Sequence, residues 1–244
     1  MRVRAVGIIP ARWGSTRFPG KPLHVIAGKA MLQRVWEQCR RAKRLANVII
    51  ATDDMRIAEA AFAWGAEVAL TSSQHRSGTD RVAEVAQRAK QFTHIVNVQG
   101  DEPLADPKLI DRMVAQFERN RALQMITAAH AFTNNSDVTS PHQVKVAVDR
   151  TNHALYFTRA AIPLALRHQG IYGYTRELLL QFVRWKPTPL ERAESLEQLR
   201  ALENGVRILV LVTKTGSPGI DTPEDAAALE RQLARAARQN RRRS

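Results

Sequence analysis

The chain has 244 residues, 44% of them hydrophobic and 25% charged, which is the composition of an ordinary soluble globular protein with room for a substantial core. No apolar run approaches the ~20 residues that cross a bilayer, and the single cysteine, Cys39, excludes an internal disulfide and any metal site built from several cysteines. These features predict a cytoplasmic protein without a membrane partner.

The formal charge of +14 lies partly at the C-terminus, where the last stretch of the chain is rich in arginine. A basic tail such as residues 239–244 could bind nucleic acid. No nucleic-acid-binding motif and no basic patch with interleaved aromatic residues accompanies it. We therefore interpret the tail as the solvated end of the last helix and do not expect a nucleic-acid partner.

The first strand and the loop after it organise the chain. An apolar run over residues 3–9 predicts a buried strand, and the next loop holds Arg12, Arg17 and Lys21 among glycines and prolines. A strand, a glycine-containing cationic loop and then a helix present backbone N–H groups and positive charge to phosphate. The spacing matches neither a dinucleotide-binding motif nor a Walker loop, and the alternative is a surface loop whose cations serve solubility. Because fixed cations repel one another, we favour a loop that holds an anion.

Strands and helices are predicted to alternate along the first half of the chain, as in a parallel sheet with crossover helices. The expected elements are a helix over 29–43, a strand over 48–51, a helix over 55–64, a strand over 67–70, a helix that ends near 91, a strand over 94–98, a helix over 107–120 and a strand over 124–131. Asp54 and Asp106 are candidate helix caps. Cys39 lies on the apolar stripe of the first helix and is predicted to be a core residue. His75 is interpreted as a surface-loop residue.

The strand over 94–98 runs into the sequence Gln99-Gly100-Asp101-Glu102-Pro103. An acidic pair after a buried strand, with a glycine that lets the backbone turn, is a common way to place a carboxylate on Mg²⁺ near phosphates. The alternative is a turn before a helix cap. Asp106, directly before Pro107, already fits that cap, so we favour a metal role for Asp101.

The second half of the chain changes character. Residues 143–149 alternate at period two, which predicts an antiparallel strand with one solvated face. The other expected elements are a short strand over 170–174, a single helix over 187–202, a strand over 206–213 and a final helix that begins at Pro223. The sequence thus predicts one α/β domain over 1–244 with a mostly parallel, Rossmann-like sheet and a smaller mixed or antiparallel portion over 132–213.

Several segments together resemble the 3-deoxy-D-manno-octulosonate (Kdo) cytidylyltransferase family, the CMP-Kdo synthetases. They follow one another in order and cover nearly the whole chain. The segments are Ile9-Pro10-Ala11-Arg12, Ser15-Thr16-Arg17-Phe18-Pro19-Gly20-Lys21-Pro22-Leu23, Ala51-Thr52-Asp53, Ser77-Gly78-Thr79-Asp80-Arg81, Asn97-Val98-Gln99-Gly100-Asp101-Glu102-Pro103, Val144-Lys145-Val146, Ala154-Leu155-Tyr156-Phe157, Arg159-Ala160, Ile162-Pro163, His168, Gly170-Ile171-Tyr172-Gly173-Tyr174, Leu196-Glu197-Gln198-Leu199-Arg200 and Asp221-Thr222-Pro223-Glu224-Asp225.

The resemblance implies a nucleotide-diphospho-sugar transferase fold. It implies an enzyme that uses Mg²⁺ to transfer CMP from CTP to the anomeric hydroxyl of Kdo, a 2-keto sugar acid, and that releases pyrophosphate. The product would serve lipopolysaccharide precursor synthesis, and the enzyme would be a homodimer formed through residues 132–213.

The resemblance also implies roles for individual residues. The implied CTP-binding residues are Ala11, Arg12, Ser15, Arg17, Lys21, Ser77 and Gly78. The implied sugar-acid-binding residues are Arg81, Gln99, His168, Tyr172, Glu197 and Gln198. Asp101 and Asp221 are the implied metal ligands, and Arg12, Lys21 and Asp101 are the implied catalytic residues.

Without the resemblance, several of these side chains have structural interpretations. His168 and Tyr172 would be structural residues. Glu197 and Gln198 would form a solvated helix face. Arg81 would pair with an acidic residue of its own helix, either Glu84 or Asp80.

One segment departs from the family pattern. Only Leu164-Ala165-Leu166-Arg167 stands between Pro163 and His168, where members of the family carry a longer loop. The shortened loop leaves open the same chemistry on another acid, such as 8-amino-Kdo or a sialic acid. A separate alternative is a basic nucleic-acid-binding protein on a nucleotidyltransferase fold.

Overall fold

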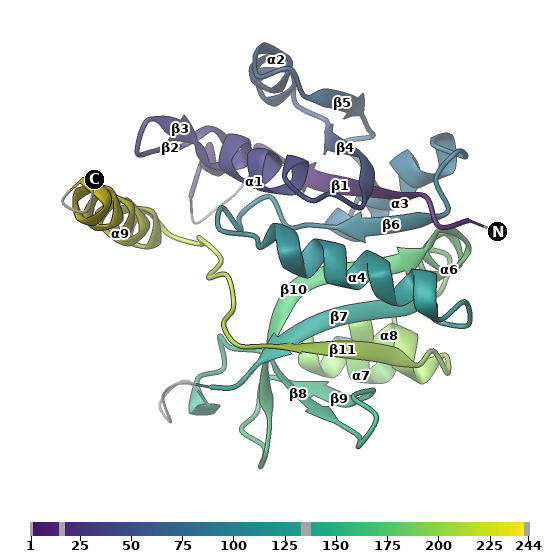
Figure 1. The fold of residues 1–244 in the computed structure, drawn as a ribbon. Helices are drawn as coiled ribbons and strands as arrows, with labels where there is room; N and C mark the ends of the chain where they lie inside the picture. The colour runs from purple at the N-terminus through teal and green to yellow at the C-terminus, as the bar shows by residue number, and fades with distance from the viewer. Residues whose placement is uncertain (1, 15–17, 133–137, 242–244) are drawn as a thin grey trace.

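The computed structural model describes residues 2–14, 18–132 and 138–241, with the backbone alone for 237–241. Its central sheet has the strand order β11-β7-β10-β6-β1-β4-β5 (Figure 1). The bounds are β1 (Ala5–Ala11), β4 (Leu45–Thr52), β5 (Glu67–Leu70), β6 (His94–Asn97), β7 (Met125–His130), β10 (Leu166–Thr175) and β11 (Ile208–Thr213). Strand β10 is antiparallel to β6 and β7, whereas the other neighbours along this order are parallel. The predicted α/β fold with a mostly parallel sheet is confirmed.

The helices cover both faces of this sheet (Figure 1). Helices α1 (Met31–Arg40), α2 (Met55–Ala63) and α4 (Pro107–Arg119) share one buried cluster with Ile9 and Ala11 of β1. Helices α3 (Gly78–Arg88), α6 (Arg176–Phe182) and α8 (Gln198–Glu203) share the other with Val6 and Ile8. A strand that is buried on both faces needs mainly apolar residues. This is why the apolar run over residues 3–9 predicted the strand β1 correctly.

Two predicted caps and the core cysteine are confirmed. The Asp54 carboxylate accepts the Arg56 N–H at 3.0 Å, and Asp106 accepts the Lys108 N–H at 2.9 Å. Cys39 is fully buried. Burial raises the pKa of its thiol, so Cys39 stays protonated and acts as a small core residue.

Other predicted boundaries are wrong. Residues 25–30 form a hairpin of β2 (Val25–Ile26) and β3 (Lys29–Ala30), so the first helix starts later than expected. The single helix expected over 187–202 is two helices, α7 (Pro189–Glu194) and α8, because Ser195 between them has a φ of 54°. The short strand expected over 170–174 is the longer β10, and α6 after it was not predicted.

The smaller antiparallel portion consists of β8 (Lys145–Val148) and β9 (Ala154–Thr158), which extend from β10. The predicted antiparallel strand is therefore present, but its expected solvated face is wrong at Lys145, which is fully buried. The Lys145 ammonium donates to the carbonyls of Ser140 and Arg159, at 2.5 and 2.8 Å. These hydrogen bonds offset part of the free-energy cost of burying the ammonium. Burial lowers the pKa of Lys145.

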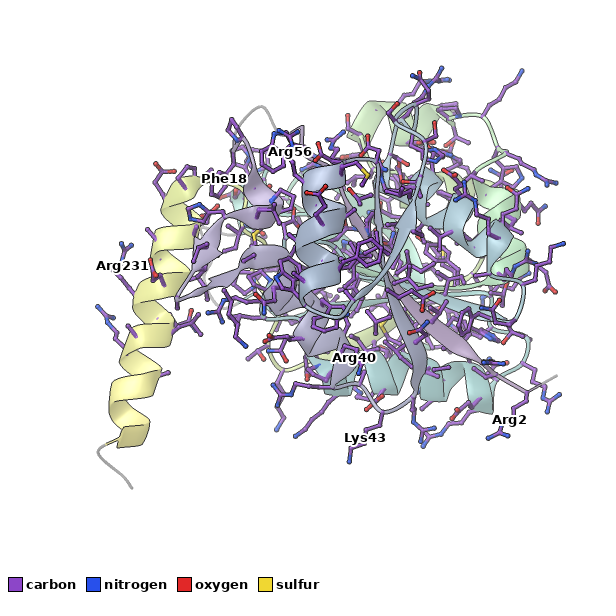
Figure 2. All side chains as sticks on the ribbon, turned by 90° about the horizontal axis from the view of Figure 1, so that it is seen from above. Arg2, Phe18, Arg40, Lys43, Arg56 and Arg231 are labelled. Carbon is purple, nitrogen blue, oxygen red and sulfur yellow. The ribbon has the colours of Figure 1, made fainter. Side chains whose placement is uncertain are left out.

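Helix α9 (Pro223–Arg241) begins at the predicted proline and lies beside the β2–β3 hairpin at the margin of the molecule (Figure 1). Ala226 and Leu229 are buried against Ile26, and the Ala27 N–H donates to Glu230 at 2.9 Å. Arg231 points away from the body in Figure 2. The basic tail over 239–244 lies only partly within the described residues. No helix in the described ranges has both the length and the apolar character to span a membrane.

Candidate active site

A cavity of about 310 Å³ opens at the carboxyl ends of β1 and β6, where sheets of this type bind ligands. Most residues implied by the family resemblance for CTP and metal lie on it, together with two of those implied for the sugar acid. The predicted residues that line it are Ala11, Arg12, Lys21, Ser77, Gly78, Arg81, Gln99, Asp101 and Asp221. Ser15 and Arg17 lie outside the described residues.

Lys21 joins the two aspartates at the mouth of this cavity. It begins a short 3₁₀ helix, η1 (Lys21–Leu23), and its backbone N–H donates to the Phe18 carbonyl at 3.1 Å. Its ammonium contacts Asp101 Oδ2 at 2.6 Å and Asp221 Oδ1 at 3.3 Å. Two aspartates from the middle and the C-terminal part of the chain thus share one cation.

Two glycines, Gly78 and Gly100, lie next to Pro10 of β1, and the approach at Gly100 is too close for a side chain. A Cβ at Gly100 would lie 2.8 Å from the Pro10 carbonyl oxygen, which is closer than real Cβ contacts come. A Cβ at Gly78 would meet the Pro10 ring at 3.4 Å. Gly100 is therefore required for the loop with Asp101 to reach the end of β1.

Arg81 is buried in the cavity wall and pairs across the sheet edge rather than along its own helix. Its guanidinium lies 3.0 Å from Asp53 Oδ1 and donates to the Thr71 hydroxyl at 2.5 Å. The alternative partners expected from sequence, Glu84 and Asp80, are wrong for this reason. Asp53 comes directly after β4, at the carboxyl edge of the sheet, where folds of this type bind ligands.

Glu84 instead pairs with His75, whose Nε2 lies 2.5 Å from Glu84 Oε2. His75 and Arg76 both line the cavity. His75 lies in the loop before α3, as predicted, but it is half-buried and forms part of the cavity wall. The sequence does not predict the His75–Glu84 pair, because the contact forms only when the loop that holds His75 folds back onto α3.

Two of the residues implied for the sugar acid, His168 and Tyr172, lie on β10. Gln99 links them to the cavity, since its amide donates to the Gly170 carbonyl at 3.3 Å. The His168 Nε2 lies 2.9 Å from the Thr127 hydroxyl, and the His168 ring packs against Tyr172 at 5.4 Å between centroids. Burial lowers the pKa of His168 to about 3 and raises that of Tyr172, so both are neutral at neutral pH.

Glu197 and Gln198 stand at the start of α8. The interpretation of this pair as a solvated helix face is wrong for Gln198, which is buried. Glu197 accepts a hydrogen bond from the Thr79 hydroxyl at 2.7 Å. The buried pair of Arg200 Nε and Glu191 Oε2, 2.8 Å apart, ties α8 to α7 and so fixes where Glu197 stands.

Asp101 and Asp221 are the residues that could hold a metal. Within the described ranges, no three His, Cys, Asp or Glu side chains form a group that could hold one. Mg²⁺ typically takes one or two carboxylates and completes its shell with substrate phosphates and water. The donor set therefore fits an ion that is shared with a bound phosphate. Glu102, next to Asp101, is buried, and burial together with the Asp101 charge raises the pKa of Glu102 to about 8.

The chain is similar to known proteins along nearly its whole length. The cytidylyltransferase family model matches residues 6–208. The 3-deoxy-manno-octulosonate cytidylyltransferase of Geobacter metallireducens is 45% identical over an alignment that covers 96% of this chain and 99% of that protein. The protein of the same name from Pseudomonas syringae pv. tomato is 47% identical, with coverage of 93% and 96%.

Solved structures give the same result. A CMP:2-keto-3-deoxy-manno-octonic acid synthetase complexed with CTP matches with a TM-score of 0.92 and 37% identity, over 96% of this chain and 99% of that one. The 4-diphosphocytidyl-2C-methyl-D-erythritol synthase of Anaerococcus prevotii, with 14% identity and a TM-score of 0.66, shares the fold alone. Sequence identities of 45% and 47% over nearly the full length of both proteins show that the chain belongs to the 3-deoxy-manno-octulosonate cytidylyltransferase family.

Proposed function

We propose that this chain transfers CMP from CTP to the anomeric hydroxyl of Kdo and releases pyrophosphate. One observation carries the proposal: a cation and two aspartates from distant parts of the chain meet at the carboxyl edge of the sheet in a member of this family. The alternatives of another sugar acid and of nucleic-acid binding are not favoured by the relatives, which are named for Kdo.

Arg12 and Lys21 are proposed to bind the triphosphate and to stabilise the charge that develops as pyrophosphate leaves. Both line the cavity, and positive groups held in a partly buried site stabilise such charge more than they would in water. Ser15 and Arg17, on the same loop, are proposed to bind the triphosphate as well. Ala11, Ser77 and Gly78 are proposed to hold the nucleoside.

Asp101 and Asp221 are proposed to hold Mg²⁺. When bound, the ion would neutralise phosphate charge and lower the pKa of the attacking hydroxyl. The protein's part is to bring the two carboxylates together at the carboxyl edge of the sheet.

The sugar acid is proposed to bind among Arg81, Gln99, His168, Tyr172, Glu197 and Gln198. The supporting contacts are the Gln99–Gly170 and Thr79–Glu197 hydrogen bonds, which join this group to the cavity. Neutral His168 and Tyr172 would offer hydrogen bonds to sugar hydroxyls, whereas the Arg81 guanidinium would attract the carboxylate of the acid.

The assembly and setting are further proposals. A homodimer formed through residues 132–213 is supported by two exposed apolar side chains there, Leu155 at 62% and Leu164 at 98% exposure. A cytoplasmic enzyme that serves lipopolysaccharide precursor synthesis fits a family whose product is an activated Kdo.

The test is pyrophosphate release with CTP, Mg²⁺ and a panel of 2-keto sugar acids that includes Kdo, 8-amino-Kdo and a sialic acid. Kdo should give the highest kcat/KM. A clear preference for another acid would overturn the assignment of substrate, and no release with any acid would overturn the assignment of reaction.

A further inference from the structure

The ammonium of Lys21 fills the space between the two aspartates. It donates to Asp101 Oδ2 at 2.6 Å, to the Ile220 carbonyl at 2.9 Å and to Asp221 Oδ1 at 3.3 Å. A lysine ammonium has three protons, and these three protein oxygens can take all of them. In this state Lys21 therefore has no donor left for a phosphate.

The oxygens that surround Lys21 are those that a hard divalent cation would take. Two carboxylates and a carbonyl are ordinary ligands for such ions. The Lys21 side chain is only 14% exposed, so its charge is weakly screened there. An ammonium and a divalent cation cannot both use the same carboxylate oxygens, and their like charges repel at this spacing.

We infer that Lys21 keeps the Asp101–Asp221 pair closed to divalent cations until a triphosphate draws its ammonium away. The inference rests on the proposed triphosphate site. Phosphate oxygens compete with the carboxylates for the ammonium, and the released carboxylates then join the phosphates as metal ligands. The metal is admitted with the nucleotide, and linkage requires that each one strengthens the binding of the other.

Backbone contacts keep the two aspartates together when Lys21 changes. The Ile220 N–H donates to the Asp101 carbonyl at 2.9 Å, and the Ile220 side chain is buried against Phe18 and Leu229. Removing the ammonium therefore takes away the positive charge that Lys21 places between the two carboxylates. Such a pair attracts a divalent cation more strongly than before.

The experiment measures Mn²⁺ binding to the full chain by calorimetry, without nucleotide or sugar acid. Lys21→Met, which keeps the length of the side chain but not its charge, should bind Mn²⁺ about tenfold more tightly than wild type, within the usual range of coupling between sites. Adding Asp101→Asn to Lys21→Met should remove the gain. Lys29→Met is the matched control, because Lys29 pairs with Glu37 on the surface, and it should leave Mn²⁺ binding unchanged.

Equal Mn²⁺ affinity in wild type and Lys21→Met would overturn the inference. Lys21→Gln gives the same comparison if the methionine variant does not fold. In wild type, the ammonium resonance of Lys21 should shift in NMR spectra when CTP is added without metal, and an unchanged resonance would also overturn it.

The outcome is separable from the proposed function. Mn²⁺ binding without nucleotide does not depend on which nucleotide or acid the enzyme uses. Tighter Mn²⁺ binding by Lys21→Met, together with no product from CTP and Kdo in wild type, would count against the function alone. Normal product formation with no gain in Mn²⁺ affinity would count against the inference alone.

Discussion

The hydroxyl of Thr79 donates a 2.7 Å hydrogen bond to the carboxylate of Glu197, which lies 118 positions further along the chain. Thr79 belongs to the first turn of α3, directly after Gly78 in the wall of the cavity. Glu197 immediately precedes α8. This contact joins the side of the site proposed for the nucleotide to the side proposed for the sugar acid.

Thr79→Val should therefore affect the two substrates differently. Valine has nearly the shape of threonine but cannot donate, so the Glu197 carboxylate loses a partner worth about 1 kcal/mol. The KM for Kdo should rise severalfold, while the affinity for CTP measured by calorimetry stays near that of wild type. Equal losses for both substrates would show that Thr79 serves the fold rather than Glu197.

Asp101→Asn should abolish metal-dependent pyrophosphate release and leave the fold intact. The change removes one carboxylate charge from the proposed metal pair at a partly exposed position. Turnover and thermal unfolding should be measured together, with Asp111→Asn as a control on α4, where the carboxylate accepts the Arg44 backbone N–H at 2.7 Å. Turnover like that of wild type in Asp101→Asn would refute the metal role.

Lys21→Ala should weaken CTP binding, because the variant lacks a cation proposed to contact the triphosphate. Charge-assisted hydrogen bonds of this kind contribute about 1.5–3 kcal/mol, so the Kd for CTP should rise by about tenfold or more. Calorimetry without a divalent cation would measure it, so that a change in metal binding does not contribute, with Lys29→Ala as the control of equal charge change. An unchanged Kd in Lys21→Ala would argue against the triphosphate role.

Gly100→Ala should reduce both stability and turnover. Its new Cβ would lie 2.8 Å from the Pro10 carbonyl, a backbone atom that cannot rotate away, and such overpacking costs about 1–3 kcal/mol. Gly219→Ala is the matched control, because no atom would lie within 4 Å of its Cβ. Denaturant unfolding of the two variants should differ clearly, and equal midpoints would contradict the proposed close approach.

Glu191→Ala should destabilise the α7–α8 region strongly. It would leave the Arg200 guanidinium buried without its carboxylate, and breaking a buried pair costs about 3–5 kcal/mol. Glu37→Ala breaks the exposed pair with Lys29 and should cost about 1 kcal/mol or less. Urea unfolding of both variants measures the difference, which would be absent if the Arg200–Glu191 pair were unimportant.

Local patterns in the sequence were sufficient for most elements of the fold. Three kinds of local signal predicted elements correctly: the apolar run over residues 3–9, the caps Asp54 and Asp106, and the proline at the start of α9. Each signal depends on residues within a few positions of one another, so it can be recognised in the sequence. The break at Ser195 was missed because a non-glycine residue with positive φ carries no local signal. The burial of Lys145 was not predicted either. It depends on hydrogen bonds to the carbonyls of Ser140 and Arg159, and the sequence does not show that these two carbonyls lie beside the Lys145 ammonium.

The sequence by itself determined that this is an α/β nucleotide-binding chain of the Kdo cytidylyltransferase type, because strand and helix periods are local and its motifs stand in order. Tertiary structure alone decided which charges meet: Arg81 with Asp53, and Lys21 with Asp101 and Asp221. Charge pairing depends on distances of a few ångströms between residues far apart along the chain. Only the packed sheet fixes those distances.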